Sequence, residues 1–535
     1  MRLAGKKFIV VLLYILLILG CLGIVAVVSR LAGDSGRHPH PAGETGREIL
    51  EETEASPSDV AREGQTEAGQ SDGEMPGNGH PEPDDGAVKW SEAYRRWYWK
   101  QRDRDQGLTQ PEEAGVEEPY VPPTIMMASD LHYMSAATHD EGAAFWKMVD
   151  ADDGKLNQYS EEMIDALVEE AIAKQPSALV LSGDITLNGE RINHEELARK
   201  LRKVQEAGVP VAVIPGNHDI NNKNAATYFG DKRKEAEYLH SGEEFWEIYH
   251  EFGYDQSPNR DPDSLSYVFP VDAGHWLLMI DSCQYEDYNH VNGRLKPETL
   301  AWLEVHLKVA KEHGIRVLPV AHHNLLSESR LYKTECTLEN YDEVTALFER
   351  YEVPLYVSGH LHAQRIKKHK PEPGTPMDAY GISEIVLSPY SMPPNQYGEL
   401  SWTEDGDMVF ETRRVDVSAY TDTPGVSVEE LTALSKAVIK KQVMKTIQGI
   451  PDDLKETMAV LYANLYYDYC AGNRMTWDEV EMTKAYLLWQ RVSPDSKYVA
   501  EMGEMIEDVK EDLHGWEWEQ TGPGVETEVQ KADEG

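Results

Sequence analysis

Five short motifs combine carboxylate, amide and imidazole side chains at spacings that suit metal ligands. In chain order they are Asp130-Leu131-His132, Gly183-Asp184, Gly216-Asn217-His218-Asp219, His322-His323-Asn324 and Gly359-His360-Leu361-His362. Imidazole suits transition metals, and carboxylate and amide oxygens suit harder divalent cations. The motifs contain no thiolate, which argues against a structural Cys-rich zinc site. This mixture of side chains predicts a metal centre.

Each motif alone is common by chance, but each one follows a short apolar run. The runs, which include one without a motif, are Thr124–Ala128, Ala178–Leu181, Val209–Ile214, Trp276–Ile280, Val317–Ala321 and Pro354–Val357. Helical patterns such as Glu161–Lys174 and His194–Ala207 lie between the runs. Strands alternating with helices predict an α/β domain, whose ligands bind at the carboxyl ends of the strands.

The spacing within the motifs also suggests a local geometry. In D-x-H and H-x-H, a side-chain period of two would point both ligands the same way from an extended chain. The glycines before Asp184, Asn217 and His360 would let the backbone turn tightly beside the centre.

The motif order D-x-H, G-D, G-N-H-[DE], H and G-H-x-H resembles the calcineurin-like metallophosphoesterase superfamily, over roughly residues 120–415. Within it, Gly183-Asp184-Ile185-Thr186, Asn188-Gly189-Glu190 and His194-Glu195-Glu196-Leu197 are similar to the class III cyclic-nucleotide phosphodiesterases. A closer similarity is to secreted or anchored bacillus- and listeria-type members with an extra helical C-terminal domain. The resemblance implies a β-sandwich flanked by helices over residues 119–417.

The resemblance also implies roles for individual residues around two metal ions. One ion would be held by Asp130, His132 and His362, the other by Asn217, His322 and His360, with Asp184 bridging both. His322 aligns better than His323 as the ligand. A water or hydroxide between the ions would attack phosphorus, and His218, with Asp219 expected to orient it, would donate a hydrogen bond or proton. His, Asp and Asn ligands accept Mn, Fe or Zn, so the metals' identity stays open.

The expected function is that of an exported, membrane-anchored phosphodiesterase with two metals, acting on cyclic nucleotides. A phosphomonoesterase or a cell-envelope phosphodiesterase on the same site is the alternative, since substrate choice lies in loops. A non-catalytic binding protein is the alternative from another class, and the complete ligand set argues against it.

Some other residues near the motifs invite functional readings. Asp150–Lys155 is similar to a calcium loop, but an EF-hand needs an oxygen ligand where Gly154 stands, so a polar loop is expected. His194 is expected to be structural. Tyr133, Asn292 and Arg294 follow strand ends and are candidates for shaping substrate binding.

Composition limits the partners of the chain. Its 535 residues contain 51 Lys and Arg against 94 Asp and Glu, a net charge of −43. This surplus of acid argues against a nucleic acid polymer but allows a small phosphate ester. Four Cys exclude a disulfide-stapled scaffold, and the pairing of Cys283, Cys336 and Cys470 cannot be predicted. The oligomeric state is also open.

The N-terminus predicts a membrane anchor over residues 1–30. Phe8–Val28 is an uncharged apolar stretch long enough to span a bilayer, preceded by Arg2, Lys6 and Lys7. The positive-inside rule then places the N-terminus in the cytoplasm and the catalytic domain outside, in a single-pass protein of the cell membrane. A cleaved signal peptide is the main alternative, and Ile18–Cys21 faintly resembles a lipoprotein box.

The remaining segments are predicted from composition and periodicity. Residues 31–118 are expected to be a disordered acidic stalk, whose basic aromatic segment 89–104 would contact a membrane or dock on the following domain. After a hairpin that closes the catalytic domain, residues 418–520 are predicted to form an all-α domain and residues 521–535 a disordered tail. The expected hairpin strands are Tyr397–Trp402 and Met408–Val415, and the expected helices are Ser427–Gln448, Asp452–Tyr469, Thr476–Gln490 and Pro494–Leu513.

Overall fold

The computed structural model describes residues 120–326, 329–369, 381–511 and 513–519. The predicted anchor (1–30), stalk (31–118, with its segment 89–104) and tail (521–535) lie outside these ranges. Among the residues that are described, no helix is long and apolar enough to cross a membrane.

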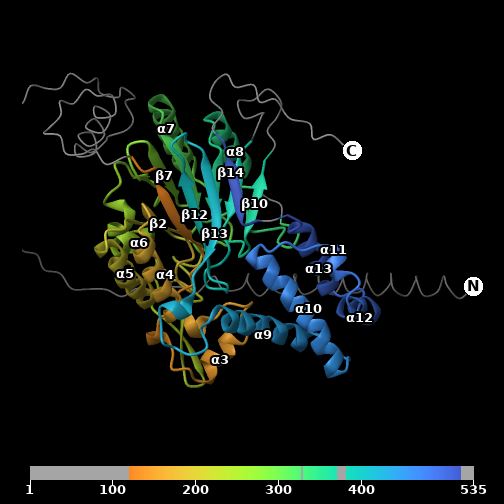
Figure 1. Cartoon of the computed structure of the whole chain (residues 1–535). Coiled ribbons are helices and arrows are strands. Elements are labelled where there is room, and N and C mark those ends of the chain that lie inside the picture. Colours follow the sequence, from red (N-terminus) through yellow and green to blue (C-terminus); the bar gives the residue numbers. More distant parts are fainter. Residues whose placement is uncertain (1–119, 327–328, 370–380, 512, 520–535) are drawn as a thin grey trace, which may run out of the picture. The chain divides into compact units, whose positions relative to one another are not determined.

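Two six-stranded sheets form the centre of the structure (Figure 1). The first has the order β14-β13-β12-β1-β2-β3, and the second β10-β11-β9-β8-β7-β6. Their strands are β1 Thr124–Ala128, β2 Ala178–Ser182, β3 Val211–Ile214, β6 Tyr267–Pro270, β7 His275–Ile280, β8 Arg316–Ala321, β9 Leu355–Ser358, β10 Arg365–Lys368, β11 Ser383–Val386, β12 Gln396–Trp402, β13 Met408–Arg414 and β14 Gly515–Trp518. A separate hairpin joins β4 Ala226–Phe229 to β5 Lys232–Glu235.

All six apolar runs are strands, with ends that differ from the prediction by at most two residues. β1, β2 and β3 pair in parallel, and so do β7, β8, β9 and β11. Parallel strands need crossover connections. Helices supply them between β1 and β2 (α3 Ala143–Val149 and α4 Ser160–Lys174), between β2 and β3 (α5 Arg191–Glu206), between β7 and β8 (α7 Pro297–His313) and between β8 and β9 (α8 Tyr341–Arg350). The helix α6 Gly242–Tyr249 precedes β6 instead. A mixed α/β fold is therefore confirmed.

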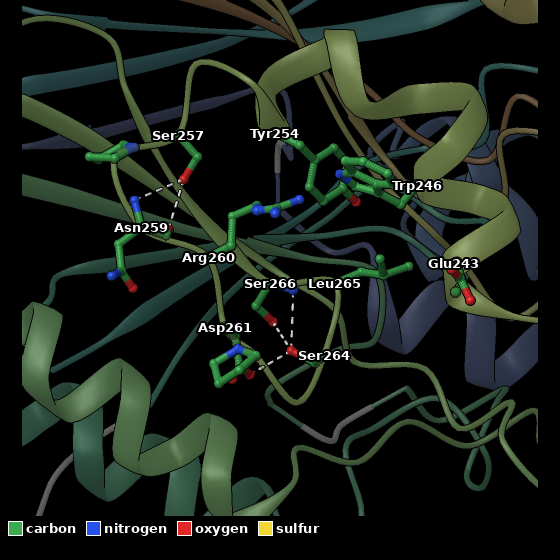
Figure 2. A pocket seen from close by; sticks show the side chains of 13 residues that line it. Glu243, Trp246, Tyr254, Ser257, Asn259, Arg260, Asp261, Ser264, Leu265 and Ser266 are labelled. Atoms are coloured by element: carbon green, nitrogen blue, oxygen red, sulfur yellow. Dashed lines mark hydrogen bonds between the residues drawn. The ribbon is translucent and has the colours of Figure 1, made fainter. Parts of the chain in front are cut away.

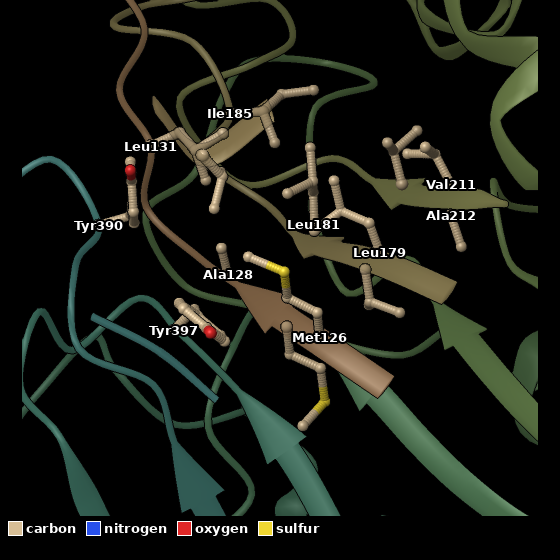
Figure 3. Packing of buried hydrophobic residues seen from close by; sticks show 14 of the residues in the cluster. Met126, Ala128, Leu131, Leu179, Leu181, Ile185, Val211, Ala212, Tyr390 and Tyr397 are labelled. Atoms are coloured by element: carbon tan, nitrogen blue, oxygen red, sulfur yellow. The ribbon is translucent and has the colours of Figure 1, made fainter. Parts of the chain in front are cut away.

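The alternation of side chains along β7 builds two cores. Leu277 and Met279 belong to the core between the sheets, whereas Trp276, Leu278 and Ile280 belong to the core under α7 and α8. β2 and β3 are buried along their whole length and share their core with α4 and α5. Figure 3 shows side chains of β1, β2 and β3 packed together. Each fully buried aliphatic side chain there contributes about 1.5–3 kcal/mol to folding.

The C-terminal segment contains five helices. They are α9 Val428–Thr446, α10 Asp452–Ala471, α11 Trp477–Val480, α12 Lys484–Val492 and α13 Lys497–Asp508. The predicted helix Thr476–Gln490 is divided into α11 and α12, because the Thr483 side chain accepts a hydrogen bond from Tyr486 N and starts a new helix. The predicted hairpin is present as β12 and β13.

The expectation that residues 418–520 are all-α needs a correction. β14 lies in this segment and pairs antiparallel with β13, at the edge of the first sheet. The alternation Gly515-Trp516-Glu517-Trp518 is a strand pattern, and Trp516 and Trp518 pack against the catalytic core. The core of helices α9–α13 also includes Leu361 and Val386, which belong to the metal-motif region and to β11. These helices therefore have a core of their own, which extends to residues of the sandwich.

Candidate metal centre

The loops after β1, β2, β3, β8 and β9 meet at one edge of the sandwich. Asp130, Asp184, Asn217, His322 and His360 each follow one of these strand ends by at most three residues. Backbone hydrogen bonds join the loops: His132 N donates to Asp184 O over 2.9 Å, and Gly359 N donates to His322 O over 3.0 Å. The structure thus brings the predicted ligand residues together at the carboxyl ends of the strands.

A first group of ligand atoms comes from Asp130, His132, Asp184 and His362, and these atoms lie within 4.8 Å of one another. His362 Nε2 lies 3.3 Å from Asp130 Oδ1 and 3.0 Å from His132 Nε2. Adjacent ligands of one octahedral ion, with bonds of about 2.1 Å, are separated by about 3 Å. The spacing therefore suits a single ion.

A second group contains Asp184, His322 and His360. His322 Nε2 lies 3.4 Å from Asp184 Oδ2 and 3.1 Å from the amide oxygen of Asn217. The other ring nitrogen of His322, Nδ1, donates to Ser182 O over 3.0 Å, so the lone pair of the neutral ring lies on Nε2. Asp184 belongs to both groups, as the bridging position requires.

The second histidine of the doublet lies outside both groups. His323 Nδ1 is 2.8 Å from Ser282 Oγ, and its Nε2 is 2.9 Å from Val291 O. Both ring nitrogens are engaged by the protein, so this geometry favours His322 as the ligand.

The backbone at the centre is left-handed, which corrects the expected extended geometry. Asp130, His132, His360 and His362 have φ values of 53°, 42°, 67° and 56°, and Asp184 has 47°. Non-glycine residues rarely adopt positive φ, and each such residue costs on the order of 1–3 kcal/mol. The paired ligands are therefore aimed by strained turns, which the hydrogen bonds between the loops hold in place.

The glycines before Asp184, Asn217 and His360 all stand at close approaches between loops, as two of them illustrate. A Cβ on Gly183 would lie 2.6 Å from His322 Nδ1, and Gly183 also has a φ of 97°. A Cβ on Gly359 would lie 2.6 Å from Asp130 Oδ2. The glycine at each position lets one ligand loop touch another.

Asp219 supports the loops rather than orienting His218. Its buried carboxylate accepts hydrogen bonds from Gly216 N (2.8 Å), Ile185 N (3.1 Å) and Thr186 N (2.9 Å). Burial and the nearby charge of Asp184 raise the pKa of Asp219 to about 6. The expected orientation of the His218 ring by Asp219 is therefore wrong.

The His218 ring is oriented by a backbone carbonyl and an amide instead. Its Nδ1 lies 2.8 Å from Leu187 O and 3.1 Å from Asn188 Oδ1. Because a carbonyl oxygen only accepts, Nδ1 donates, and Nε2 is left for a ligand. Nε2 lies 4.0 Å from Asp184 Oδ2, and about a third of the side chain (34%) is exposed. His218 thus stands at the rim of the ligand groups with one nitrogen available.

In the metal-free protein, the charged groups of the centre shift one another's pKa values. Burial opposes ionisation of Asp184, but the charges of His322 and His218 outweigh it and hold its pKa well below the ordinary value. Burial likewise opposes protonation of His322 and His362, but the carboxylates of Asp184 and of Asp130 and Asp153 outweigh it and raise both pKa values to about 9. Burial and the charge of His322 lower the pKa of His360 to about 4. The carboxylates of the centre thus stabilise positive charge on the neighbouring His322 and His362 rings.

The other residues considered above have partners within the protein. Tyr133 is buried, and its hydroxyl donates to a glutamate of α4 over 2.8 Å. Asn292 and Arg294 both contact Glu339, at 3.3 and 3.4 Å. His194 is buried between Tyr249 OH and Asp219 O, each at 3.0 Å, and burial lowers its pKa to about 3. The structural role expected for His194 agrees with these contacts.

The loop Asp150–Lys155 supplies its own cation. Lys155 Nζ lies 2.7 Å from Asp153 Oδ1 and 3.2 Å from Asp152 Oδ1. A calcium ion would have to compete with the lysine ammonium group for these carboxylates. The loop also reaches the metal centre, because Asp153 Oδ2 lies 3.9 Å from His362 Nδ1.

A separate cavity of about 510 Å³ lies beside the α6 helix and the loop that precedes β6 (Figure 2). Trp246, Tyr254 and Arg260 line it, and the Arg260 guanidinium stacks over the Trp246 ring at 5.3 Å. None of the predicted site residues lines this cavity.

Two supporting groups were missed by sequence reasoning. Glu384 on β11 is buried and accepts hydrogen bonds from Leu325 N, Leu326 N and Ser358 Oγ, each at 2.7 Å. It thereby connects the His322 loop to the strand before His360. The backbone oxygen of Glu335 lies 2.8 Å from His360 Nε2. Glu384 could have been found in the sequence, because it is a lone glutamate inside the apolar run of β11. The Glu335 carbonyl could not, because a backbone carbonyl has no sequence signal.

Comparison with known proteins agrees with the geometry. Residues 123–364 match the family described as calcineurin-like phosphoesterase. This part of the chain is a calcineurin-like phosphoesterase domain. The chain is accordingly a metal-dependent phosphoesterase, a hydrolase of phosphate esters. No curated protein is significantly similar to the chain.

Three solved structures are similar to parts of the chain at low identity. A dimetal phosphatase from Danio rerio is 15% identical, with 55% of this chain and 97% of that chain covered and a TM-score of 0.40. A purple acid phosphatase from yellow lupin seeds is 14% identical, with 57% and 53% covered and a TM-score of 0.38. PhoD is 14% identical, with 61% and 78% covered and a TM-score of 0.31. The chain thus spans about half the length of the lupin enzyme.

The residues of the calcineurin-like domain fit two divalent ions. Asp130, His132 and His362 would hold one, Asn217, His322 and His360 the other, and Asp184 both. Ring nitrogens, carboxylates and an amide oxygen are ligands for Mn, Fe or Zn, and this donor set does not choose among them.

Proposed function

We propose that this protein is a phosphodiesterase that hydrolyses small phosphodiesters, with cyclic nucleotides as the substrate class. The observation that carries the proposal is the sharing of Asp184 between two ligand groups, with the free nitrogen of His218 at their rim. Two ions at such a site supply Lewis acidity to the phosphoryl oxygens and lower the pKa of a water molecule. The protein's own contribution is to hold these ligands and to place a proton donor beside them.

His218 is suited to protonating the leaving oxygen. Its Nδ1 donates to Leu187 O, so Nε2 is the nitrogen that faces the space beside Asp184, from which a proton would pass to the leaving oxygen. An alkoxide leaving group, as in a cyclic nucleotide, needs such a proton more than a phenolate does. Asn188 also contacts Nδ1, and it lies in the Asn188-Gly189-Glu190 segment that resembles the cyclic-nucleotide branch.

The charge of the protein favours a diester over a monoester. A phosphate monoester carries about −1.5 to −2 charges at pH 7, whereas a diester carries one. A chain with a net charge of −43 repels the dianion more strongly than the monoanion. Long polyanions such as DNA or RNA are disfavoured further.

A hydrolysis panel tests the substrate class. The Mn²⁺-loaded full chain would be assayed with 3′,5′- and 2′,3′-cyclic nucleotides, bis-p-nitrophenyl phosphate and p-nitrophenyl phosphate. We expect the highest kcat/KM for a cyclic nucleotide, with Asp184→Asn as the control for contaminating phosphatases. Preference for p-nitrophenyl phosphate, or rapid cleavage of DNA or RNA, would overturn the proposal.

We also propose that the chain is anchored in the cell membrane by Phe8–Val28, with the catalytic domain outside the cytoplasm. The support is the length of the uncharged stretch and the cations before it. Replacing Leu16 and Leu19 by arginine costs about 2.5–3.5 kcal/mol of insertion per charge. After carbonate extraction, the variant should be lost from the membrane fraction, whereas the wild-type protein should remain there. Equal retention of the variant and the wild type would contradict the anchor.

A further inference from the structure

Two loops connect the metal centre to the C-terminal helices. One comprises residues 329–336, and its Glu335 carbonyl accepts a hydrogen bond from His360 Nε2 over 2.8 Å. The other comprises residues 150–155, and its Asp153 lies 3.9 Å from His362 Nδ1. Outer partners of this kind fix the ring orientation and the tautomer of ligating histidines. The two histidines of the last motif are thus each contacted by a different loop.

The first loop is tied down mainly by α10 and α13. Ser329 Oγ lies 2.9 Å from Tyr469 OH, and Tyr332 OH lies 2.9 Å from Tyr466 OH. Lys333 Nζ pairs with Glu504 over 2.6 Å. These three partners belong to C-terminal helices, whereas Cys336 O, next to Glu335, accepts a hydrogen bond from Asn324 N of the catalytic domain over 3.1 Å. The carbonyl that contacts His360 is therefore positioned from both sides, and the helices supply the side-chain contacts.

Asp508, the last residue of α13, joins this loop to the strand after the final motif. Its carboxylate accepts from Arg330 N over 2.8 Å and pairs with Arg365 Nη2 over 3.0 Å. The side chains of Asp508 and Arg365 are each 3% exposed. Arg365 follows His362 by three residues, so one buried ion pair links the helices to both the loop and the motif.

The second loop is held by α9. Ser435 Oγ donates to Gly154 O over 2.8 Å, and Lys441 Nζ pairs with Asp150 Oδ2 over 2.5 Å. Gly154 has a φ of 119°, and a Cβ there would lie 3.1 Å from Ile439 of α9. The loop therefore lies directly against the helix, and its Asp153 is oriented from there toward His362.

We propose that the C-terminal helices position the metal ligands His360 and His362 through these two loops, with Asp508, Tyr466 and Lys333 as positioning residues. The helices then set the metal affinity of the catalytic domain. This inference rests on the two-metal centre and not on the substrate class, so a failed hydrolysis panel would leave it standing.

The test is metal affinity of the full chain, measured by Mn²⁺ titration calorimetry and by the absorption spectrum of the Co²⁺-loaded protein. The double variant Tyr466→Phe/Lys333→Ala removes one hydroxyl contact and one exposed ion pair of the loop. We expect its affinity for the weaker-bound ion to fall about tenfold or more, with a changed Co²⁺ spectrum, because outer partners are worth about 10–100-fold. The unfolding midpoint of the metal-free protein should stay within a few degrees of wild type.

A matched control distinguishes positioning from general loosening. Lys440→Ala breaks the exposed ion pair to Glu456, which joins α9 to α10 over 3.0 Å without touching either loop. Its metal affinity and Co²⁺ spectrum should equal those of wild type. Asp508→Asn, if it folds, should lower the affinity at least as much as the double variant. Affinities within twofold of wild type in the double variant, or an equal loss in Lys440→Ala, would overturn the proposal.

Discussion

Nε2 of His322 lies 3.4 Å from Oδ2 of Asp184, a carboxylate that also lies 3.9 Å from Nε2 of His132. His132 follows strand β1 of the first sheet, and His322 follows strand β8 of the second. Asp184 therefore lies between candidate metal ligands that come from both sheets. Two cations held by these two ligand groups would repel each other without an anion between them. Asp184 therefore decides whether a two-metal centre forms.

Replacing the shared carboxylate tests this relationship. Asp184→Asn keeps the size of the side chain but removes its charge, and we expect metal content to fall from about two ions per chain to well below one. Elemental analysis after dialysis measures it. Asp272→Asn is the control, because Asp272 is a half-buried carboxylate paired with His275 at the β6–β7 turn. Full metal content in Asp184→Asn would show that the carboxylate does not bridge.

His218→Ala separates catalysis from metal binding. The Nδ1 of His218 is bonded to Leu187 O, and the ring belongs to neither ligand group, so both ions should stay bound in the variant. Loss of the proton donor should lower kcat by about 10²–10⁴-fold. The fall should be larger for substrates with alkoxide leaving groups than for p-nitrophenyl esters. Loss of metal in this variant would show that His218 is a ligand, and His250→Ala, at an exposed ion pair, controls for the removal of an imidazole.

Metal binding should release protons. In the metal-free protein the pKa values of His322 and His362 are raised to about 9, since the carboxylates of Asp184, and of Asp130 and Asp153, outweigh burial. Both rings are then protonated at pH 7, and a metal must displace those protons. Apparent affinity should rise about tenfold per pH unit for each ion between pH 6 and 8. Calorimetry in buffers of different ionisation enthalpy would count the protons, and a pH-independent affinity would contradict the assignment.

The same histidines should make the stability of the metal-free protein fall with rising pH, whereas its metal affinity should rise. Their folded pKa of about 9 exceeds the unfolded value of about 6.5. Their stabilising contribution is therefore complete below pH 6.5 and is lost as the pH rises toward 9. Denaturant unfolding in the presence of a chelator should show this fall, whereas stability of the Mn²⁺-loaded protein should rise over the same range.

Glu384→Gln should change how stability depends on pH. Burial raises the pKa of Glu384 to about 7, against an ordinary value of 4.5. A raised carboxyl pKa means that the folded state binds more protons, so this group lowers the free energy of unfolding as the pH rises from about 4.5 to 7, by roughly 2–4 kcal/mol. The glutamine variant should lack that fall, measured against wild type by urea unfolding of the chelated protein. Parallel pH curves for the two proteins would refute it.

Local patterns in the sequence were sufficient for the six apolar runs, for the hairpin strands β12 and β13 and for the residues that meet at the candidate metal centre, but not for β4, β5, β6, β10, β11 or β14. Buried parallel strands are short apolar runs, and a carboxyl end is where polar ligands must stand, so Asp130, Asp184 and His360 could be found without coordinates. The strand β14 is harder to find, because its alternating pattern is only four residues long and follows a helical region, and its partner β13 is about a hundred residues away in the sequence.

Contacts between distant segments decided the rest. The choice of His322 over His323 depends on Ser282 and Val291, which occupy both nitrogens of the second ring. The role of Asp219 depends on three backbone amides from two loops, and no spacing in the sequence encodes them. Residue types and their order specify which chemistry is available, because ligand preference is a property of the side chain. Orientation, protonation and support are set only when segments such as Glu335 and His360 are brought within hydrogen-bonding distance by the fold.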